Sequence, residues 1–242
     1  MKVSQKIEKQ ISQIPEGRVF GYQDMVLEAD EYGAAAKSLG RLVETGQLKR
    51  ATKGVYYKPK QSIFGLLPPR EEELLKRYLF ENGQRVAYVT GIGLYNAMGL
   101  TTQVPFIVTI ASKTRRTFVS VGNLKIKPAK SYADITNDNY YVLGILDAIK
   151  DFNIIPDKDS RSVITILSNK IKELNIEDTD KLLQFSLQYP PRVRALLGAI
   201  VEKSGKTFAL DTLKKSLNPL SKYKKYAIKD IVLSNLVNWN LK

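Results

Sequence analysis

The sequence predicts an α+β protein in three parts, and three observations support this prediction. Residues 1–60 contain three helical patterns followed by two short alternating runs. Residues 61–136 mix helical and strand-like patterns, whereas residues 137–242 carry one helical pattern after another. With 242 residues, of which 43% are hydrophobic, the chain is long enough to bury a core in two or three domains.

The first part begins with an amphipathic helix over residues 3–14, whose valine and isoleucine residues recur on one side. A short second helix is predicted over residues 22–29 and a third over residues 32–45, which Gly46 ends. The runs "QLKRA" and "VYYKP" then alternate like strands around a turn at residues 52–54. Three helices followed by a hairpin are typical of a winged helix-turn-helix domain.

The other two parts are separated from the first by "SIFGLLPPR" (residues 62–70), where a glycine and two prolines interrupt regular structure. The middle part then shows a helix, the strand-like runs "RVAYVTG" and "FIVTIAS" around a short helix, and further strands up to "KIKPAK". From about residue 139, six helical segments alternate with Pro, Gly, Asn or Asp, which predicts an all-helical C-terminal domain over residues 137–242.

The charge and composition narrow the class of function. Thirty-eight Lys and Arg against 24 Asp and Glu give a net charge of +14, which favours nucleic acid, an anionic membrane or an acidic partner. Apolar runs stay far below the roughly 20 residues that span a bilayer, so no membrane partner is expected. The chain has no His and no Cys, which excludes the usual zinc sites and the His-dependent nucleophiles. We expect a cytoplasmic protein that is not an enzyme and has no catalytic residue, metal or cofactor.

The basic face of the third helix suits insertion into the major groove of DNA, where side chains reach base edges. Charged residues on the hairpin would meet phosphates or the adjacent minor groove. The predicted DNA-binding residues are Ala34, Lys37, Ser38 and Arg41 on the helix, and Lys49, Arg50 and Lys53 on the hairpin. The alternative is that these charges only solvate a small domain and that the hairpin contacts another protein.

A second basic surface is predicted in the middle of the chain. Residues 61–130 contain ten basic and four acidic residues, the highest net positive charge per residue in the sequence. Its candidates are Arg115 and Arg116 at a hairpin tip and Lys125 and Lys127 in "KIKPAK". A solvated loop is the alternative interpretation for each of these segments.

Several phrases together resemble a known family. The phrases are "GQLKRATKGVYYKP", "SIFGLLPP", "YVTGIGLYNAMGLTTQVP" and "YPPRVRALLGAI". They resemble the AbiEi-type antitoxin and transcriptional-regulator family of bacterial type IV toxin–antitoxin systems, in its Bacteroidetes-type branch. Within this likeness, "GLYNAMGLTTQVP" is the most specific stretch.

The resemblance implies a protein with two tasks. Its N-terminal domain would bind double-stranded DNA at an inverted repeat in its own promoter and repress its operon. The rest of the chain would counteract a nucleotidyltransferase-like toxin, in family terms without a stable complex. The alternative from another class is a winged-helix module that binds a partner protein without sequence-specific DNA recognition. The operator, the toxin and the oligomeric state stay open at this point.

Overall fold

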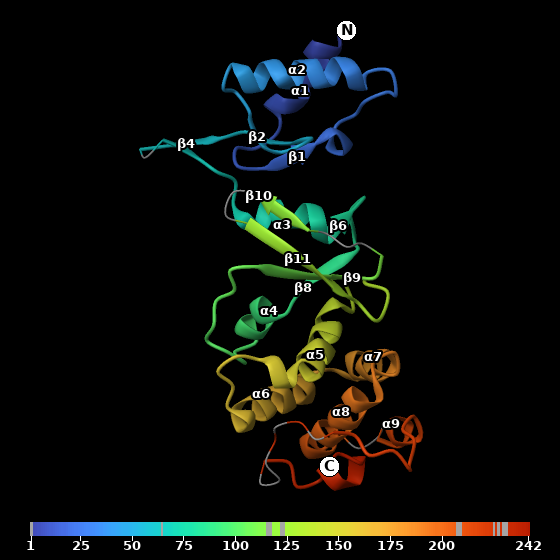
Figure 1. Ribbon diagram of the computed structural model, residues 1–242. Coiled ribbons are helices and arrows are strands. Elements are labelled where there is room, and N and C mark those ends of the chain that lie inside the picture. Colours follow the sequence, from blue (N-terminus) through green and yellow to red (C-terminus); the bar gives the residue numbers. More distant parts are fainter. Residues whose placement is uncertain are drawn as a thin grey trace. The chain divides into compact units, whose positions relative to one another are not determined.

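The computed structural model describes residues 2–63, 65–114, 118–121, 124–206, 210–224, 226, 228 and 232–242. It is mixed α+β, as the sequence predicts (Figure 1). The chain divides into two compact units. Unit 1 comprises Met1–Tyr78 with Ser120–Leu124, and unit 2 comprises Leu79–Val119 with Lys125–Lys242.

Unit 1 combines short helices with a small antiparallel sheet of order β1-β3-β2 (Figure 1). Its elements are α1 (Val3–Ser12), β1 (Val19–Gly21), the 3-10 turn η1 (Tyr22–Asp24), α2 (Tyr32–Glu44), β2 (Lys49–Thr52), β3 (Val55–Tyr57), β4 (Lys60–Ser62), β5 (Gly65–Leu67) and α3 (Glu71–Leu79). The predicted hairpin is confirmed: β2 pairs with β3, and Gly54 adopts a φ of +72° in the turn that joins them. Strand β5 lies inside residues 62–70, the segment in which the sequence predicts an interruption of regular structure.

The core of unit 1 is formed where α1 and α2 pack together over the sheet. Ile7 and Ile11 of the predicted apolar stripe on α1 are buried, and α2 contributes Ala35, Leu39 and Leu42. The sheet contributes Phe20 and Tyr56. Since apolar residues at helical spacing face this core, α2 necessarily presents its remaining side chains outward.

The predicted second helix over residues 22–29 is wrong, because only η1 is helical there. At Met25 the backbone is already extended, with φ −111° and ψ 145°. Two side chains hold this path. The Asp24 carboxylate accepts the Gly21 backbone N–H at 2.7 Å, and the Gln10 amide bonds both backbone groups of Val26, at 2.9 and 3.3 Å. These hydrogen bonds replace the ones that a helix would make.

Unit 2 joins a sheet to a group of helices. In its sheet, β8 is antiparallel to β9, and β9 is parallel to β11. Its strands and helices are β6 (Phe80–Glu81), β7 (Gln84–Arg85), β8 (Ala87–Thr90), α4 (Ile92–Ala97), β9 (Val108–Ser112), β11 (Leu124–Lys130), α5 (Tyr140–Lys150), η2 (Phe152–Ile154), α6 (Ser160–Glu173), α7 (Ile176–Ser186), α8 (Pro191–Ser204), α9 (Leu210–Lys215) and η3 (Leu236–Trp239). Strand β10 (Val119–Val121) crosses the division between the two units in the sequence.

One apolar core spans the sheet and the helices of unit 2. It includes Tyr88 and Ala111 from the strands and runs without interruption into α5, α6 and α8. Helix α5 is buried from Val142 to Ile149 because it packs against the sheet on one side and α7 and α8 on the other. The structure therefore differs from the predicted boundary at residues 136/137: the strands need the helices to cover their apolar face.

The C-terminal segment folds back on α8. The sequence predicts a helix over "YAIKDIVLSNLV", part of which lies outside the described residues, and the described part contains only the short turn η3. Trp239 at its end is buried, and its indole Nε1 donates to the Glu202 carboxylate at 2.8 Å. Asn235 donates to the same oxygen at 2.7 Å. Among the described helices, none has the length and apolar character to cross a membrane.

Candidate functional site

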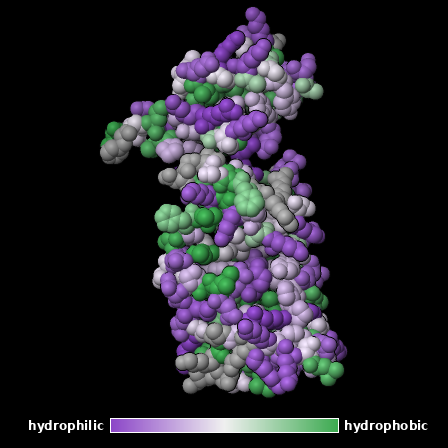
Figure 2. Space-filling model, viewed as in Figure 1, coloured by the Kyte–Doolittle hydropathy of each residue, from purple (hydrophilic) through white to green (hydrophobic). Residues whose placement is uncertain are grey.

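Helix α2 presents three of its four predicted DNA-binding residues to solvent. Ala34, Lys37 and Arg41 are exposed on the side opposite the core, and Lys37 and Arg41 are four residues apart, so they are neighbours on one helical face. Neither Lys37 nor Arg41 forms an ion pair within the described part of the chain. On the face of unit 1 seen in Figure 2, hydrophilic residues cover much of α2. This surface therefore has positive charges available to a ligand.

Ser38 does not belong to this exposed face, which corrects its predicted role in DNA binding. The residue is only 9% exposed, and its hydroxyl donates to the Ala34 carbonyl at 3.0 Å. At 100° per residue, Ser38 lies about 40° from Leu42 and about 60° from Ala35 around the helix, so it borders the side that faces the core. Its hydroxyl satisfies a backbone carbonyl instead of reaching outward.

The hairpin does not bring its three predicted basic residues to one face. In the strand pairing, Lys49 is opposite Tyr57 and Arg50 is opposite Tyr56. Because successive side chains on a strand point to opposite faces, Lys49 and Arg50 diverge. Lys53 is exposed in the turn, while Arg50 folds back and donates from Nε to the Thr52 carbonyl at 3.3 Å. We therefore rank Lys53 above Arg50 as a free positive charge.

An aromatic cluster that the sequence did not reveal supports the hairpin from within unit 1. The Tyr22 and Tyr56 hydroxyls lie 3.3 Å apart, and their rings meet edge to face at 6.2 Å. The hydrogen bond with Tyr56, together with burial, raises the pKa of Tyr22 to about 12, against a small opposing effect of Arg50. Tyr22 also lies beside Gly54, so it fixes the turn of the hairpin relative to the core.

Two acidic residues near α2 form ion pairs within unit 1. The Glu31 carboxylate accepts from the Lys6 ammonium at 2.6 Å, and this hydrogen bond lowers the pKa of Glu31. Asp24 binds the Arg77 guanidinium of α3 at 2.7 Å. Lys6 therefore offsets the charge of Glu31, whereas Glu28, Asp30 and Glu44 are exposed and still reduce the field of Lys37 and Arg41.

The second predicted basic surface is described only in part. Lys125 and Lys127 are exposed on β11, and because they are two residues apart they point to the same side of the strand. Arg115 and Arg116 lie outside the described residues.

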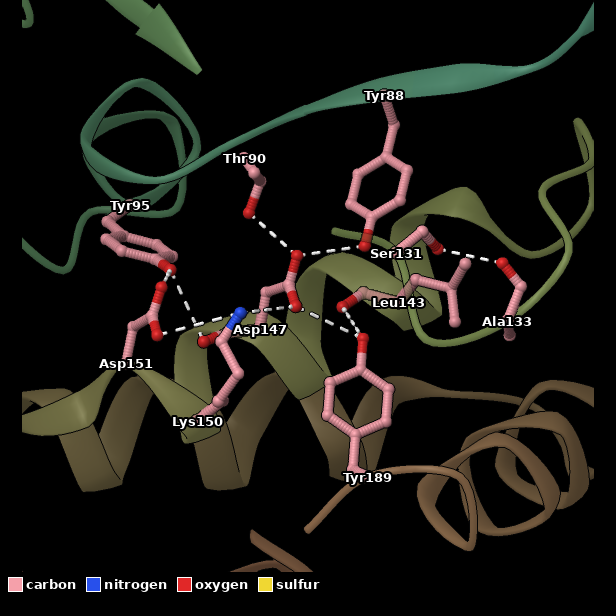
Figure 3. Close-up of polar contacts among 10 residues, drawn as sticks. All are labelled: Tyr88, Thr90, Tyr95, Ser131, Ala133, Leu143, Asp147, Lys150, Asp151 and Tyr189. Atoms are coloured by element: carbon pink, nitrogen blue, oxygen red, sulfur yellow. Dashed lines mark hydrogen bonds and ion pairs between the residues drawn. The ribbon is translucent and has the colours of Figure 1, made fainter. Parts of the chain in front are cut away.

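Unit 2 contains a buried carboxylate that the sequence analysis missed. Asp147, on α5, is fully buried and its Oδ2 accepts hydrogen bonds from Tyr88 and Thr90, both at 2.8 Å (Figure 3). Its Oδ1 accepts from Tyr189 and from Lys150, both at 3.1 Å. The available signal was a lone carboxylate inside the apolar run "VLGILDAI", since a buried charge requires partners.

Electrostatics fix the protonation of this network. Burial, followed by the charge of Asp147, raises the pKa of Tyr88 and of Tyr189, so both hydroxyls stay protonated and donate. Burial alone lowers the pKa of Lys150, but the charges of Asp147 and Asp151 outweigh it and raise the pKa above its ordinary value. At neutral pH, Lys150 is therefore an ammonium between two carboxylates, 3.1 Å from Asp147 and 3.6 Å from Asp151.

These features define an α+β protein of two units, with an exposed basic helix in the first and a buried carboxylate network in the second. The chain belongs to DUF6088, a family of unknown function, which matches residues 6–184. Its fold is similar to that in the crystal structure of the RV2827C protein from Mycobacterium tuberculosis. The TM-score is 0.50 at 9% identity, over 91% of this chain and 83% of that one. At this identity the likeness concerns the fold alone. No curated protein matches the chain.

Proposed function

We propose that the chain is a DNA-binding transcriptional regulator in which unit 1 acts as a winged helix-turn-helix domain. The order α1, η1, α2 and the β2–β3 hairpin supports this proposal, with η1 in place of a full second helix. Helix α2 would enter the major groove, and the turn at Lys53 would lie along the backbone of the DNA. The net charge of +14 supports an anionic ligand.

The observation that carries the proposal is the outward face of α2. Lys37 and Arg41 are exposed and free of ion pairs within the described residues, and the small side chain of Ala34 allows close approach on the same face. An arginine in this position can bind guanine O6 and N7 with two hydrogen bonds. Lys53, in the turn of the hairpin, would neutralise a phosphate.

The contrast between Arg41 and Lys53 tests this assignment. In a gel-shift assay with the inverted repeat upstream of the gene, Arg41→Ala is expected to reduce the preference for this repeat over scrambled DNA by roughly tenfold. Lys53→Ala is expected to weaken binding to both DNAs about equally. The affinity of this variant for DNA should also depend less steeply on salt, because one phosphate contact is lost.

Lys172→Ala, an exposed lysine on α6 in unit 2, is the matched control and should leave both affinities unchanged. If Arg41→Ala and Lys53→Ala both bound the repeat like the unaltered protein, the assignment of α2 and the hairpin would be wrong. A winged-helix module that binds a partner protein would then be the better proposal.

We extend the proposal to an antitoxin that counteracts a nucleotidyltransferase-like toxin, because the four phrases quoted above resemble the AbiEi-type family. Co-expression of the full chain with the toxin encoded beside it is expected to restore growth. The double variant Lys37→Ala/Arg41→Ala should restore growth equally at matched protein levels, since repression and neutralisation are assigned to different parts of the chain. Persistent growth arrest with the full-length protein would overturn the antitoxin proposal and leave the DNA-binding one intact.

A further inference from the structure

A pocket of about 360 Å³ opens on unit 2, where α4, β9, β11 and the end of α5 meet. Its size falls at the lower end of the range of small-molecule sites. Most of its lining is apolar, from Ile92, Pro105, Phe106, Ile107 and Ile154. Gly91 and four residues with polar groups complete it, namely Tyr95, Thr109, Lys127 and Asp151. An apolar pocket with a few converging polar groups is the usual form of a ligand site.

The sheet places the positive side of the pocket. In the parallel pairing of β11 and β9, Lys127 is directly opposite Thr109, and Thr109 is in turn opposite Thr90 on β8. Residues paired in this way point to the same face of a sheet, so all three follow one row across it. Thr90 at the inner end is bonded to Asp147, whereas Lys127 at the outer end is exposed and has no ion pair within the described residues.

The end of α5 places the negative side. The Asp151 carboxylate accepts the Tyr95 hydroxyl at 2.7 Å and keeps a side-chain exposure of 23% (Figure 3). Lys150 is closer to Asp147 than to Asp151, so the two carboxylates share a single ammonium. One negative charge is therefore left over, and a carboxylate has acceptor positions beyond those that Tyr95 and Lys150 use.

The apolar rim of the pocket is unusually open to solvent. Phe106 is 95% exposed and Ile154 is 71% exposed, with Val104 close by in the chain at 76%. Figure 2 shows hydrophobic residues gathered over α4 and the chain that follows it. A cluster of large apolar side chains held in water indicates a surface that a ligand covers.

We propose that this pocket binds a free α-amino acid with an apolar or aromatic side chain. The ammonium group of the ligand would pair with Asp151, and its carboxylate with Lys127 and the Thr109 hydroxyl. Its side chain would cover Phe106, Ile107 and Ile154. A ligand with only one charge could pair with only one of Lys127 and Asp151, so the pocket favours the zwitterion. This inference concerns unit 2 alone and does not depend on DNA binding.

Calorimetric titration of the full chain with three matched probes tests the proposal. The probes are L-phenylalanine, phenethylamine, which lacks the carboxylate, and 3-phenylpropionate, which lacks the ammonium. L-phenylalanine is expected to bind with a Kd of about 1 mM or lower, and about tenfold more tightly than either analogue.

Two variants should remove this preference from opposite sides. Asp151→Asn is expected to weaken the binding of L-phenylalanine about tenfold and to leave the binding of 3-phenylpropionate unchanged. Lys127→Met is expected to weaken the binding of L-phenylalanine about tenfold and to leave the binding of phenethylamine unchanged. Lys125→Met, two residues away on β11 and outside the pocket lining, is the control. Phe106→Ser alters a side chain that is almost fully exposed, so it should keep the fold and still weaken L-phenylalanine.

The proposal fails if L-phenylalanine binds no better than the analogues, or if Phe106→Ser, Asp151→Asn and Lys127→Met all leave its affinity unchanged. A shift-assay result with DNA does not bear on either outcome.

Discussion

Replacing Asp147 with alanine is expected to lower the free energy of unfolding by about 3–5 kcal/mol, the usual cost of breaking a buried charged network. The carboxylate is fully buried and accepts from Tyr88, Thr90, Tyr189 and Lys150. Its removal takes an acceptor from three buried hydroxyls and leaves the Lys150 ammonium with Asp151 alone. Urea-induced unfolding, followed by circular dichroism, measures the loss.

One further variant separates charge from shape in this network, and a second serves as a surface control. Asp147→Asn keeps the size of the side chain and one acceptor oxygen, so it should lower the free energy of unfolding by less than Asp147→Ala does. Asp134→Ala breaks a surface ion pair with Lys113 in which the carboxylate side chain is 82% exposed, and it should cost at most about 1 kcal/mol. A loss below about 1 kcal/mol for Asp147→Ala would contradict the assigned role.

The pH dependence of stability checks the same ion pair. The pKa of Lys150 in the folded protein is raised above its ordinary value of 10.5. The ion pair of Lys150 therefore contributes fully to the stability of the fold below that pH. The contribution is lost as the pH rises through the raised folded pKa. The unaltered protein should therefore lose stability in this alkaline range more steeply than Asp147→Ala.

Replacing Gly198 with alanine is expected to destabilise unit 2 by about 1–3 kcal/mol through overpacking. A Cβ atom at this position would lie 2.2–2.4 Å from three atoms of the Trp239 indole. The ring cannot rotate away easily, because it is 1% exposed and its Nε1 is bonded to Glu202. The higher helix propensity of alanine offsets only part of this cost.

The single tryptophan of the chain makes the Gly198 effect directly observable. Its fluorescence should shift to longer wavelength in Gly198→Ala if the indole is pushed toward solvent. The control is Gly40→Ala on α2, where a Cβ meets nothing within 4 Å, and this variant should be neutral or slightly stabilising. Equal stability of the Gly198 and Gly40 variants would show that the indole accommodates the methyl group.

Local patterns sufficed to predict α1, α2 and the hairpin of unit 1. The apolar spacing defines the two helices, while Gly46 and Gly54, both at positive φ, mark the end of α2 and the turn. The second predicted helix failed because Gln10 and Asp24 hold residues 21–26 by side-chain hydrogen bonds, which no local pattern displays. The α+β class followed from the alternation of patterns and did not depend on these details.

Parts of the candidate sites could not be predicted because they depend on contacts between residues that are far apart in the sequence. The hydroxyls that donate to Asp147 lie 57 and 59 residues before it, at Thr90 and Tyr88, and 42 residues after it, at Tyr189. Similarly, the pocket unites Lys127 and Asp151 only because β11 pairs with β9 and α5 ends beside them. On the hairpin, the alternation of the strand separates Lys49 from Arg50, although both are basic and adjacent.

Helix α8 lies beyond the family match but belongs to the same core as the matched segment. The family match ends at residue 184, within α7, yet Tyr189 and α8 follow it and close the core over α5 and α6. A protein that kept only the matched segment would leave the inner side of α5 uncovered and one hydrogen bond of Asp147 unmade. Complete burial of the matched segment therefore depends on a stretch of chain that lies beyond the match.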